Sequence, residues 1–190
     1  MTGVTRLNVE LGPKRLELLH QAVPSAKMIA LLLNPDNPDA KTFERELGAL
    51  ALTLRLQLNV FLARGEVELE PAFQQMKDRH AEALLIGADP IFNSEAERLG
   101  RLTLRHALPA MYQYADFPEA GGLMSYGASN VESHERMGVY CGRILRGARP
   151  SDLPVEQSSK IELIVNIGTA HELGLTIPSS LLGRADRILQ

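Results

Sequence analysis

The sequence predicts an α/β domain built on a doubly wound parallel sheet. Short, continuously apolar runs alternate with longer stretches whose apolar residues recur at helical spacing. Successive strand–helix–strand units of this kind imply right-handed crossovers and hence a parallel sheet. The chain has 190 residues, 45% of them hydrophobic and 23% charged, which is enough to bury a core of ordinary composition.

The apolar runs mark the expected strands. Residues 28–33 are apolar throughout, which is typical of a strand buried on both faces. They end at a loop, residues 34–38, that contains two prolines and three short polar residues. Further strands are expected at residues 56–62, 83–86, 109–112, 122–125 and 161–165.

The amphipathic stretches between the strands are the expected helices. Residues 39–54 place Phe43 and Leu47 on one face, and residues 69–79 carry Phe73 inward. Two later helix starts show the S-x-x-E spacing of a capping box, which satisfies the free backbone groups of a helix N-terminus. Ser94 with Glu97 opens a helix to about residue 106, and Ser129 with Glu132 opens a helix to about residue 146.

The last of these helices carries two glycines four residues apart, Gly138 and Gly142. Each weakens the helix, but together they let another backbone approach closely. Something is expected to pack there, and it need not belong to this chain. Cys141 falls on the apolar side of the helix, so a buried structural thiol is preferred over a nucleophile, because no motif places a histidine partner.

Composition and motifs exclude several classes of protein. The net charge is −3 and the basic residues are scattered, which argues against a nucleic-acid binder. The single cysteine rules out an internal disulfide and a cysteine-ligated zinc site, and the five histidines form no metal motif. No phosphate-binding loop, dinucleotide glycine pattern or nucleophile elbow is present. We therefore expect no metal and no cofactor and identify no catalytic residues, while an enzyme without a recognisable motif stays open at this point.

Membrane and export signals are also missing from the sequence as it stands. The longest apolar run, residues 28–33, is far shorter than the roughly 20 residues of a membrane span. The first residues lack the charged and then apolar pattern of a signal peptide.

Polar and aromatic residues gather where the predicted strands end. Ligands of open α/β sheets bind outside the carboxyl ends of the strands, and aromatic walls with a few polar groups suit a small polar organic molecule. Turn formation and ligand contact are equally good interpretations of residues 34–38, whereas ligand contact is preferred for Asp89 and for the pair Tyr112 and Tyr114. The ligand-binding candidates are Asn34, Asn37, Asp89, Pro90, Phe92, Tyr112, Gln113, Ser125 and Tyr126.

A phosphoacceptor receiver domain is a rival interpretation, with Asp89 after the third strand as the acceptor. Its chemistry requires an acidic pair after the first strand and a lysine after the fifth. The first loop offers only Asp36 and Asp39, and no lysine lies between Lys77 and Lys160. This interpretation is therefore disfavoured.

Eight sequence blocks, in order along nearly the whole chain, resemble one family. They are GPKRLELL (12–19), LNPDNP (33–38), GADPIFNS (87–94), PAMYQY (109–114), EAGGLMSYG (119–127), GRILRG (142–147), DLPVEQ (152–157) and LGLTIP (173–178). Together they look like the ABC-transporter substrate-binding family that includes binders of tryptophan and other aromatic amino acids.

This resemblance implies the fold of a type I periplasmic binding protein. Such proteins have two α/β lobes, joined by a hinge of several crossing segments, that close around a solute and deliver it to an ABC permease. They catalyse no reaction, so the resemblance implies that this protein is not an enzyme. The expected function is binding of a small polar organic ligand, an amino acid or similar, in a cleft of which this chain supplies one wall. A small-molecule-binding enzyme or sensor domain without a recognisable motif remains the alternative.

The resemblance also implies a division of the chain. Residues 1–127 would form the sheet domain of the second lobe, residues 128–150 a hinge crossing with a first-lobe helix, and residues 151–190 the return to the sheet and the tail. The family's signal sequence and most of the first lobe would be missing, so the chain would be a truncated product or a single lobe. By resemblance the protein is periplasmic, or is anchored to the membrane on its extracytoplasmic side.

The resemblance further assigns roles and partners. Aromatic wall residues would stack on an apolar part of the ligand, and Asp89 would accept from a ligand amine. Because one wall buries little of a ligand, this chain alone would bind weakly or not at all. The bare helix around Gly138 and Gly142 predicts a homodimer. By resemblance the wall consists of Asn34, Asn37, Asp89, Phe92, Tyr112 and Tyr126.

Overall fold

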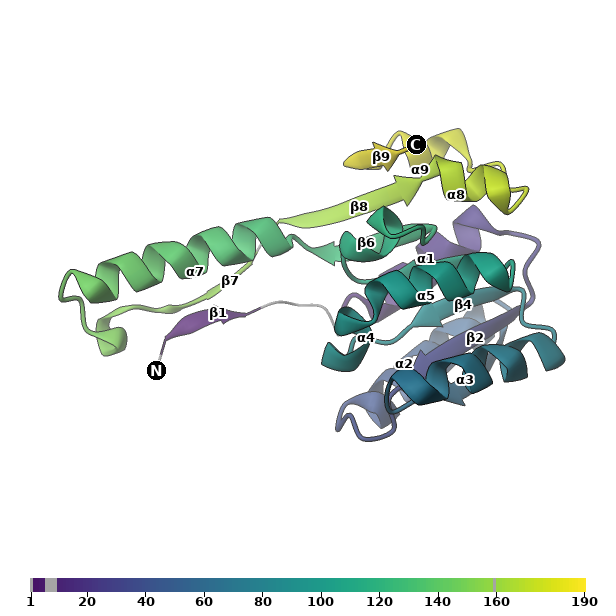
Figure 1. Ribbon diagram of the computed structural model, residues 1–190, viewed down its shortest axis with the longest axis horizontal. Coiled ribbons are helices and arrows are strands. Elements are labelled where there is room, and N and C mark those ends of the chain that lie inside the picture. Colours follow the sequence, from purple (N-terminus) through teal and green to yellow (C-terminus); the bar gives the residue numbers. More distant parts are fainter. Residues whose placement is uncertain (1, 6–9, 159) are drawn as a thin grey trace.

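The computed structural model describes residues 2–5, 10–158 and 160–190, which form a sheet domain and a protruding arm (Figure 1). The strands of the sheet domain are β2 (Met28–Leu33), β3 (Gln57–Leu62), β4 (Ala83–Ile86), β5 (Ala110–Tyr112), β6 (Met124–Ala128), β8 (Ile161–Asn166) and β9 (Arg187–Leu189). Its helices are α1 (Gly12–Ala22), α2 (Ala40–Thr53), α3 (Glu66–Asp78), α4 (Pro90–Ser94), α5 (Ala96–Arg105), α6 (Asp116–Glu119), α8 (Ile167–Glu172) and α9 (Ser179–Leu182).

The strands form one seven-stranded sheet in the order β3-β2-β4-β5-β6-β8-β9. All neighbours pair in parallel except β6 and β8, which are antiparallel. Residues of β2 alternate between two apolar cores, with Ile29 and Leu31 packed on the α1 and α2 side and Ala30 on the α3 and α5 side. Helices thus cover both faces, which confirms the predicted doubly wound α/β class.

The arm consists of β1 (Gly3–Thr5), α7 (Asn130–Leu145), a short 3-10 helix (Pro150–Asp152) and β7 (Val155–Gln157). β1 and β7 pair in parallel as a separate two-stranded sheet. The Tyr140 hydroxyl on α7 donates to the Pro154 carbonyl at 2.9 Å. Residues 3–5 therefore belong with the arm, whereas the predicted division grouped them with the sheet domain.

Two connections between arm and sheet domain meet at the start of α7. β6 leads into α7 and β8 returns from β7, and the Ser129 amide continues their pairing by donating to the Lys160 carbonyl at 2.9 Å. The Glu132 carboxylate accepts from the Ser158 hydroxyl at 2.7 Å and from the Lys160 amide at 3.0 Å. These hydrogen bonds lower the pKa of Glu132, with a further contribution from Arg136. Glu132 therefore ties the outgoing and returning segments together.

The two predicted capping boxes differ in outcome. The Ser129 hydroxyl accepts from the Glu132 amide, so the serine caps α7 as predicted, although the glutamate is used at the crossing instead. The prediction at Ser94 is wrong, because Asp89 caps a short helix, α4, that ends at Ser94. The Ser94 hydroxyl donates to the Ile91 carbonyl, and α5 begins at Ala96 without a side-chain cap.

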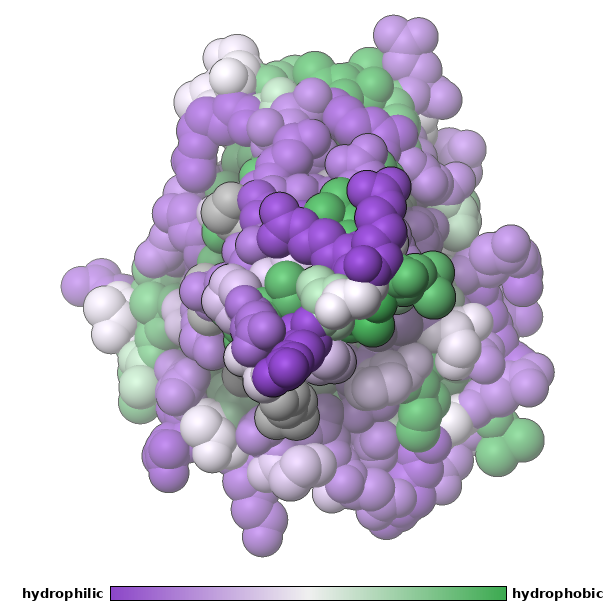
Figure 2. Space-filling model, turned by 90° about the vertical axis from the view of Figure 1, so that its left-hand side faces the viewer, coloured by the Kyte–Doolittle hydropathy of each residue, from purple (hydrophilic) through white to green (hydrophobic). Residues whose placement is uncertain are grey.

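One face of α7 is open. A Cβ atom added at Gly138 or Gly142 would meet nothing within 4 Å. Leu145 is 87% exposed, and Cys141 is exposed, so the predicted burial of this thiol is wrong in the described structure. Figure 2 looks at the arm end and shows apolar residues interspersed among hydrophilic ones on this side of the molecule. No other described segment covers the glycine-bearing face.

Within the described part of the chain, no helix combines the length and the apolar character needed to cross a bilayer.

Candidate ligand-binding site

The carboxyl ends of β2, β4, β5 and β6 lie at one edge of the sheet, because these strands run in parallel. The loop after β2 supplies Asn34 and Asn37, and the loop after β4 supplies Asp89. Residues that are distant in sequence therefore meet at this edge, as the rule for open α/β sheets predicts.

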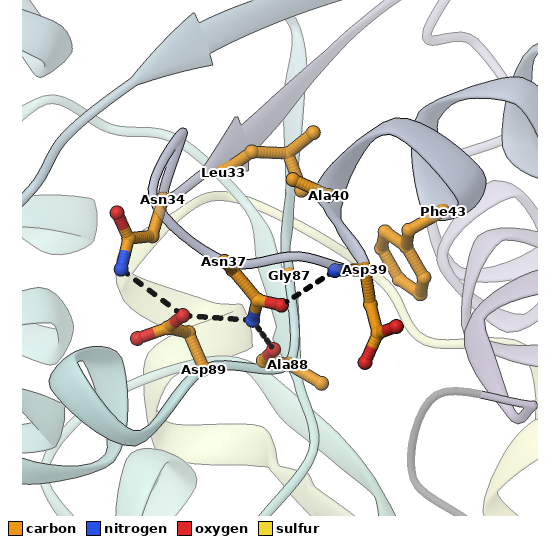
Figure 3. Close-up of a pocket in the computed structure, with 9 residues that line it drawn as sticks. All are labelled: Leu33, Asn34, Asn37, Asp39, Ala40, Phe43, Gly87, Ala88 and Asp89. Atoms are coloured by element: carbon orange, nitrogen blue, oxygen red, sulfur yellow. Dashed lines mark hydrogen bonds between the residues drawn. The ribbon is translucent and has the colours of Figure 1, made fainter.

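Asp89 is the meeting point of the two loops (Figure 3). Its Oδ2 accepts from the side-chain amide of Asn34 at 3.2 Å and from that of Asn37 at 2.8 Å. Its Oδ1 accepts from the Ile91 amide at 2.8 Å and so caps α4. With 5% of its surface exposed, Asp89 holds the edge together and keeps little capacity for a ligand amine.

Each asparagine also stabilises its own loop. Asn34 Oδ1 accepts from the Asp36 amide, and Asn37 Oδ1 accepts from the Asp39 amide, which are the short-range contacts that asparagine makes in turns. The second amide hydrogen of Asn37 reaches the Ala88 carbonyl at 3.1 Å. Turn formation and contact between loops are therefore combined in the same side chains.

A shallow depression lies over this cluster, between Leu33, Asn37, Phe43 and Ala88. Its free volume is about 10 Å³, which is room for roughly one water molecule. Sites for small organic ligands enclose hundreds of Å³. The described residues at this edge therefore form a surface against which a ligand could lie, and do not enclose one.

A second polar cluster follows β5. The Tyr112 hydroxyl donates to Asn93 Oδ1, and Gln113 Nε2 donates to the same oxygen at 2.8 Å. Burial raises the pKa of the Tyr112 phenol, so the phenol stays protonated at physiological pH. Gln113 Oε1 is buried and has no hydrogen-bond partner among the described residues, which leaves one acceptor at this edge unused.

Two of the predicted stacking residues are part of the core. Phe92 and Tyr112 are 0% exposed and pack in the apolar cluster between the sheet and α3 and α5. Tyr112 contacts Phe117 edge to face, with 6.0 Å between the ring centroids. Their rings offer no free face to a ligand in this structure, so the expected stacking role is wrong for both. The sequence pattern predicts where along the chain these residues lie, but not which way their rings point.

The remaining candidates lie at or near the same edge with different exposure. Pro90 is exposed and begins α4, whereas Ser125 in β6 is buried. Tyr126 is partly exposed and packs against the core on the α1 and α2 side. The nine candidates are therefore brought to one edge, but only some of them are accessible there.

Sequence reasoning missed Arg15. This side chain is 0% exposed, and its Nε donates to the Tyr126 carbonyl at 2.6 Å. Neither Nη atom has a hydrogen-bond partner among the described residues. A signal was present, because Arg15 precedes Leu18, Leu19 and Ala22 at helical spacing and so falls on the apolar face of its helix.

A larger groove lies elsewhere, between α3 and α5. It has a free volume of about 580 Å³ and is lined almost entirely by charged residues. Arg98 pairs with Glu66, and Arg105 pairs with Glu70, so these guanidinium groups already have partners. The groove lies on the outer surface of the helical layer, and its charged groups already satisfy one another, so it is a less suitable ligand site.

The geometry also bears on metal binding and on phosphotransfer. The described residues contain no group of three or more histidine, cysteine or acidic side chains that could hold a metal ion. Asp36, which a receiver domain would need beside Asp89, is exposed and lies 3.6 Å from the Arg64 guanidinium. The acidic pair of a receiver domain is therefore not assembled here.

Comparison with known proteins gives a family and a fold. The profile of the family described as ABC transporter substrate binding protein matches residues 1–189. No curated protein sequence matches this chain significantly.

Three solved structures share the fold at low sequence identity. The ABC domain from Streptococcus pneumoniae in complex with L-Trp is 23% identical, has a TM-score of 0.81, and is matched over 99% of this chain and 64% of its own. A conserved domain protein from Vibrio cholerae is 23% identical, with a TM-score of 0.83, over 98% of this chain and 62% of its own. The ligand-free, open structure of a substrate binding protein with adhesive properties from Clostridium difficile is 21% identical, with a TM-score of 0.65, over 100% of this chain and 62% of its own. The chain thus spans less than two thirds of the length of each.

Proposed function

We propose, from the premise that this chain belongs to the ABC transporter substrate binding protein family, that it binds a small polar organic solute at the carboxyl edge of its sheet. The family supports a solute-binding role. The finer proposal is that the solute is an amino acid or a similar molecule, and that the full site is a cleft between two lobes. One wall of that cleft is the edge that carries Asn34, Asn37, Gln113 and Tyr126.

The observation that carries this proposal is the convergence of buried polar groups at one edge of the sheet. Asn34, Asn37 and Asp89 form a preorganised cluster there, and Gln113 Oε1 remains an unused acceptor. A preorganised polar surface beside a partly exposed tyrosine suits a ligand with both polar and apolar parts. The free volume of about 10 Å³ supports a site that is completed by a second wall.

The arm supports the same proposal. Three solved structures of the same fold are each matched over only 62% to 64% of their length, so they contain chain that has no counterpart in this one. We assign the open face of α7 and the separate β1–β7 sheet to the base of a first lobe. A homodimer through α7 would cover the same face and is the competing occupant.

Partners and location follow from the family and are part of the proposal. The solute would be delivered to an ABC permease, and the protein would act outside the cytoplasmic membrane. Fractionation of the native host and intact mass measurement of the product test this directly. An extracytoplasmic species is expected; a purely cytoplasmic product of 20.9 kDa would contradict it.

The binding proposal is tested by titrating L-tryptophan into the protein. The chain contains no tryptophan, so the protein adds no indole fluorescence to that of the ligand. Saturable binding without chemical change of the ligand is expected, and weak affinity is expected for one wall alone. Turnover of an amino acid would favour the enzyme alternative, and saturable binding of none of them would contradict the proposed ligand class.

The contribution of Asp89 is tested with a matched pair of ligands. If Asp89 accepts a hydrogen bond from the ligand amine, Asp89→Ala weakens the binding of L-tryptophan more than the binding of indole-3-propionate, which has no amine. If Asp89 only holds the two loops, both ligands lose affinity by the same factor. Asp152→Ala, at an exposed position on the arm, is the control of equal charge.

A further inference from the structure

Arg15 is a buried cation without a counter-charge. It lies in the first turns of α1, has no exposed surface, and takes part in no ion pair among the described residues. Its Nε–H is satisfied by the Tyr126 carbonyl, but Nη1 and Nη2 are not satisfied by any described group. Four N–H donors on these two atoms therefore face the interior unused.

The guanidinium nevertheless keeps its charge. Burial lowers the pKa of Arg15 to about 10, which is still well above physiological pH. Its electrostatic surroundings include the phenols of Tyr112, Tyr114 and Tyr126, although the Tyr112 ring packs on the other face of the sheet. None of the three is a carboxylate, so they provide polar surroundings without an acidic counter-charge. An uncompensated buried charge is costly, and such a group is stabilised by an anion with matching geometry.

The position of Arg15 is at the ligand edge. Tyr126 lies in β6, and Tyr114 follows β5 at its carboxyl end. The N-terminus of α1 reaches the same edge, because a Cβ atom at Gly12 would come within 2.3 Å of Phe43 Cε2, and Phe43 lines the depression beside Asn37. Arg15 is thus beneath the edge that carries the candidate site, and its printed contact is with Tyr126, a partly exposed residue of that edge.

We infer that Arg15 binds a carboxylate of the ligand through Nη1 and Nη2, once the side chains that cover it at this edge move aside. A guanidinium fork and a carboxylate match in a bidentate arrangement, which gives both energy and orientation. This inference rests on the proposed function and narrows it. The solute carries a carboxylate, and uncharged or purely cationic analogues are discriminated against.

The first test compares ligands that differ only in this group. L-tryptophan and tryptamine share the indole and the amine, but tryptamine has no carboxylate. In Arg15→Met we expect the affinity for L-tryptophan to fall by about tenfold or more. The affinity for tryptamine should change by less than about twofold. Arg15→Lys keeps the charge but loses the fork, so it should fall between the two. Arg45→Met, at an exposed position on α2, is the matched control and should leave the affinity for both ligands unchanged.

The second test needs no knowledge of the ligand. The melting temperature is measured in sodium acetate and in sodium chloride of equal ionic strength, with acetate as the carboxylate probe. Acetate should raise the melting temperature of the wild type and of Arg45→Met by more than that of Arg15→Met, whose response reports only the general effect of the salt. Without any probe, Arg15→Met should be at least as stable as the wild type, because the variant removes an unpaired buried charge.

The outcomes separate this inference from the proposed function. Equal weakening of L-tryptophan and tryptamine in Arg15→Met, or an unchanged acetate response, would overturn the role of Arg15 while leaving solute binding intact. An acetate response that depends on Arg15, in a protein that binds no indole compound, would support the carboxylate site and overturn the aromatic amino acid as ligand.

Discussion

Asn37 and Asp89, 52 positions apart in sequence, are joined by a 2.8 Å hydrogen bond between the amide nitrogen of one and the carboxylate of the other. This bond fastens the loop after β2 to the loop after β4. The same carboxylate caps α4 through its other oxygen, so one side chain has two separable structural duties.

Asp89→Asn separates these two duties. The remaining side-chain oxygen can still accept from the Ile91 amide, but the new amide group would face the amides of Asn34 and Asn37, donor against donor. We expect the free energy of unfolding to fall by about 1–3 kcal/mol, the usual cost of leaving buried polar groups unsatisfied. Urea denaturation measures it, and an unchanged midpoint would show that the loops are not coupled through Asp89.

Gly100 on α5 is required for close packing against α6. A Cβ atom at this position would lie 2.5 Å from the Ala120 carbonyl oxygen, which is backbone and cannot rotate away. Gly100→Ala should therefore cost about 1–3 kcal/mol in the free energy of unfolding. Gly48→Ala on α2 is the control, because nothing lies within 4 Å of the added methyl group. That variant should be stabilised by about 0.5–1 kcal/mol through helix propensity.

Glu132 should make the crossing between sheet and arm sensitive to acid. Hydrogen bonds from Ser158 and Lys160 hold its pKa below the ordinary value of 4.5. A depressed carboxylate pKa contributes stability above the unfolded-state pKa, and this stability is lost as the pH falls through the folded-state value.

The melting temperature of the wild type should accordingly fall as the pH drops below about 4.5. In Glu132→Gln, part of that dependence should be absent, since a neutral side chain has no proton to gain. Glu135→Gln, an exposed position on the same helix, is the control. Identical pH profiles for the wild type and Glu132→Gln would contradict the role assigned to Glu132.

Cys141 provides a probe of what covers α7. Because the thiol is exposed, a thiol reagent such as DTNB should titrate one group per native chain at the rate of an unhindered cysteine. A homodimer through this face predicts labelling that slows as protein concentration rises, whereas an uncovered face predicts a constant rate. Cys141→Ser should abolish the signal.

Sequence patterns specify much of the sheet and little of the site. The run 28–33 is buried at every position as β2, because a strand covered on both faces has no polar side. Residues 83–86, which form β4, are likewise buried at every position. The edge on which the ligand candidates gather follows from strand direction alone. For that reason the sequence predicts that Asn34, Asn37 and Asp89 lie together.

What could not be predicted depends on side-chain direction and on absent neighbours. Phe92 and Tyr112 stand at strand ends, yet their rings turn into the core between the sheet and α3 and α5. Cys141 lies on the apolar side of its helix, but apolar character buries a residue only where another surface meets it. The burial of Arg15 could not be predicted, because a single charged residue within the apolar stripe of a short helix often reaches solvent at the edge of the stripe.

The antiparallel pair β6–β8 has a mechanical consequence for the arm. The pairing runs to Ala128 and Ile161, and Ser129 with Lys160 extends it to the point where the chain leaves the sheet domain. Two of the covalent connections between arm and sheet domain are thereby paired into a single ribbon. A ribbon bends readily out of its own plane, but sliding or splaying its strands breaks hydrogen bonds. At this crossing, bending is therefore the soft motion and shear the stiff one, so the two parts of such a molecule approach each other most easily by bending of the ribbon.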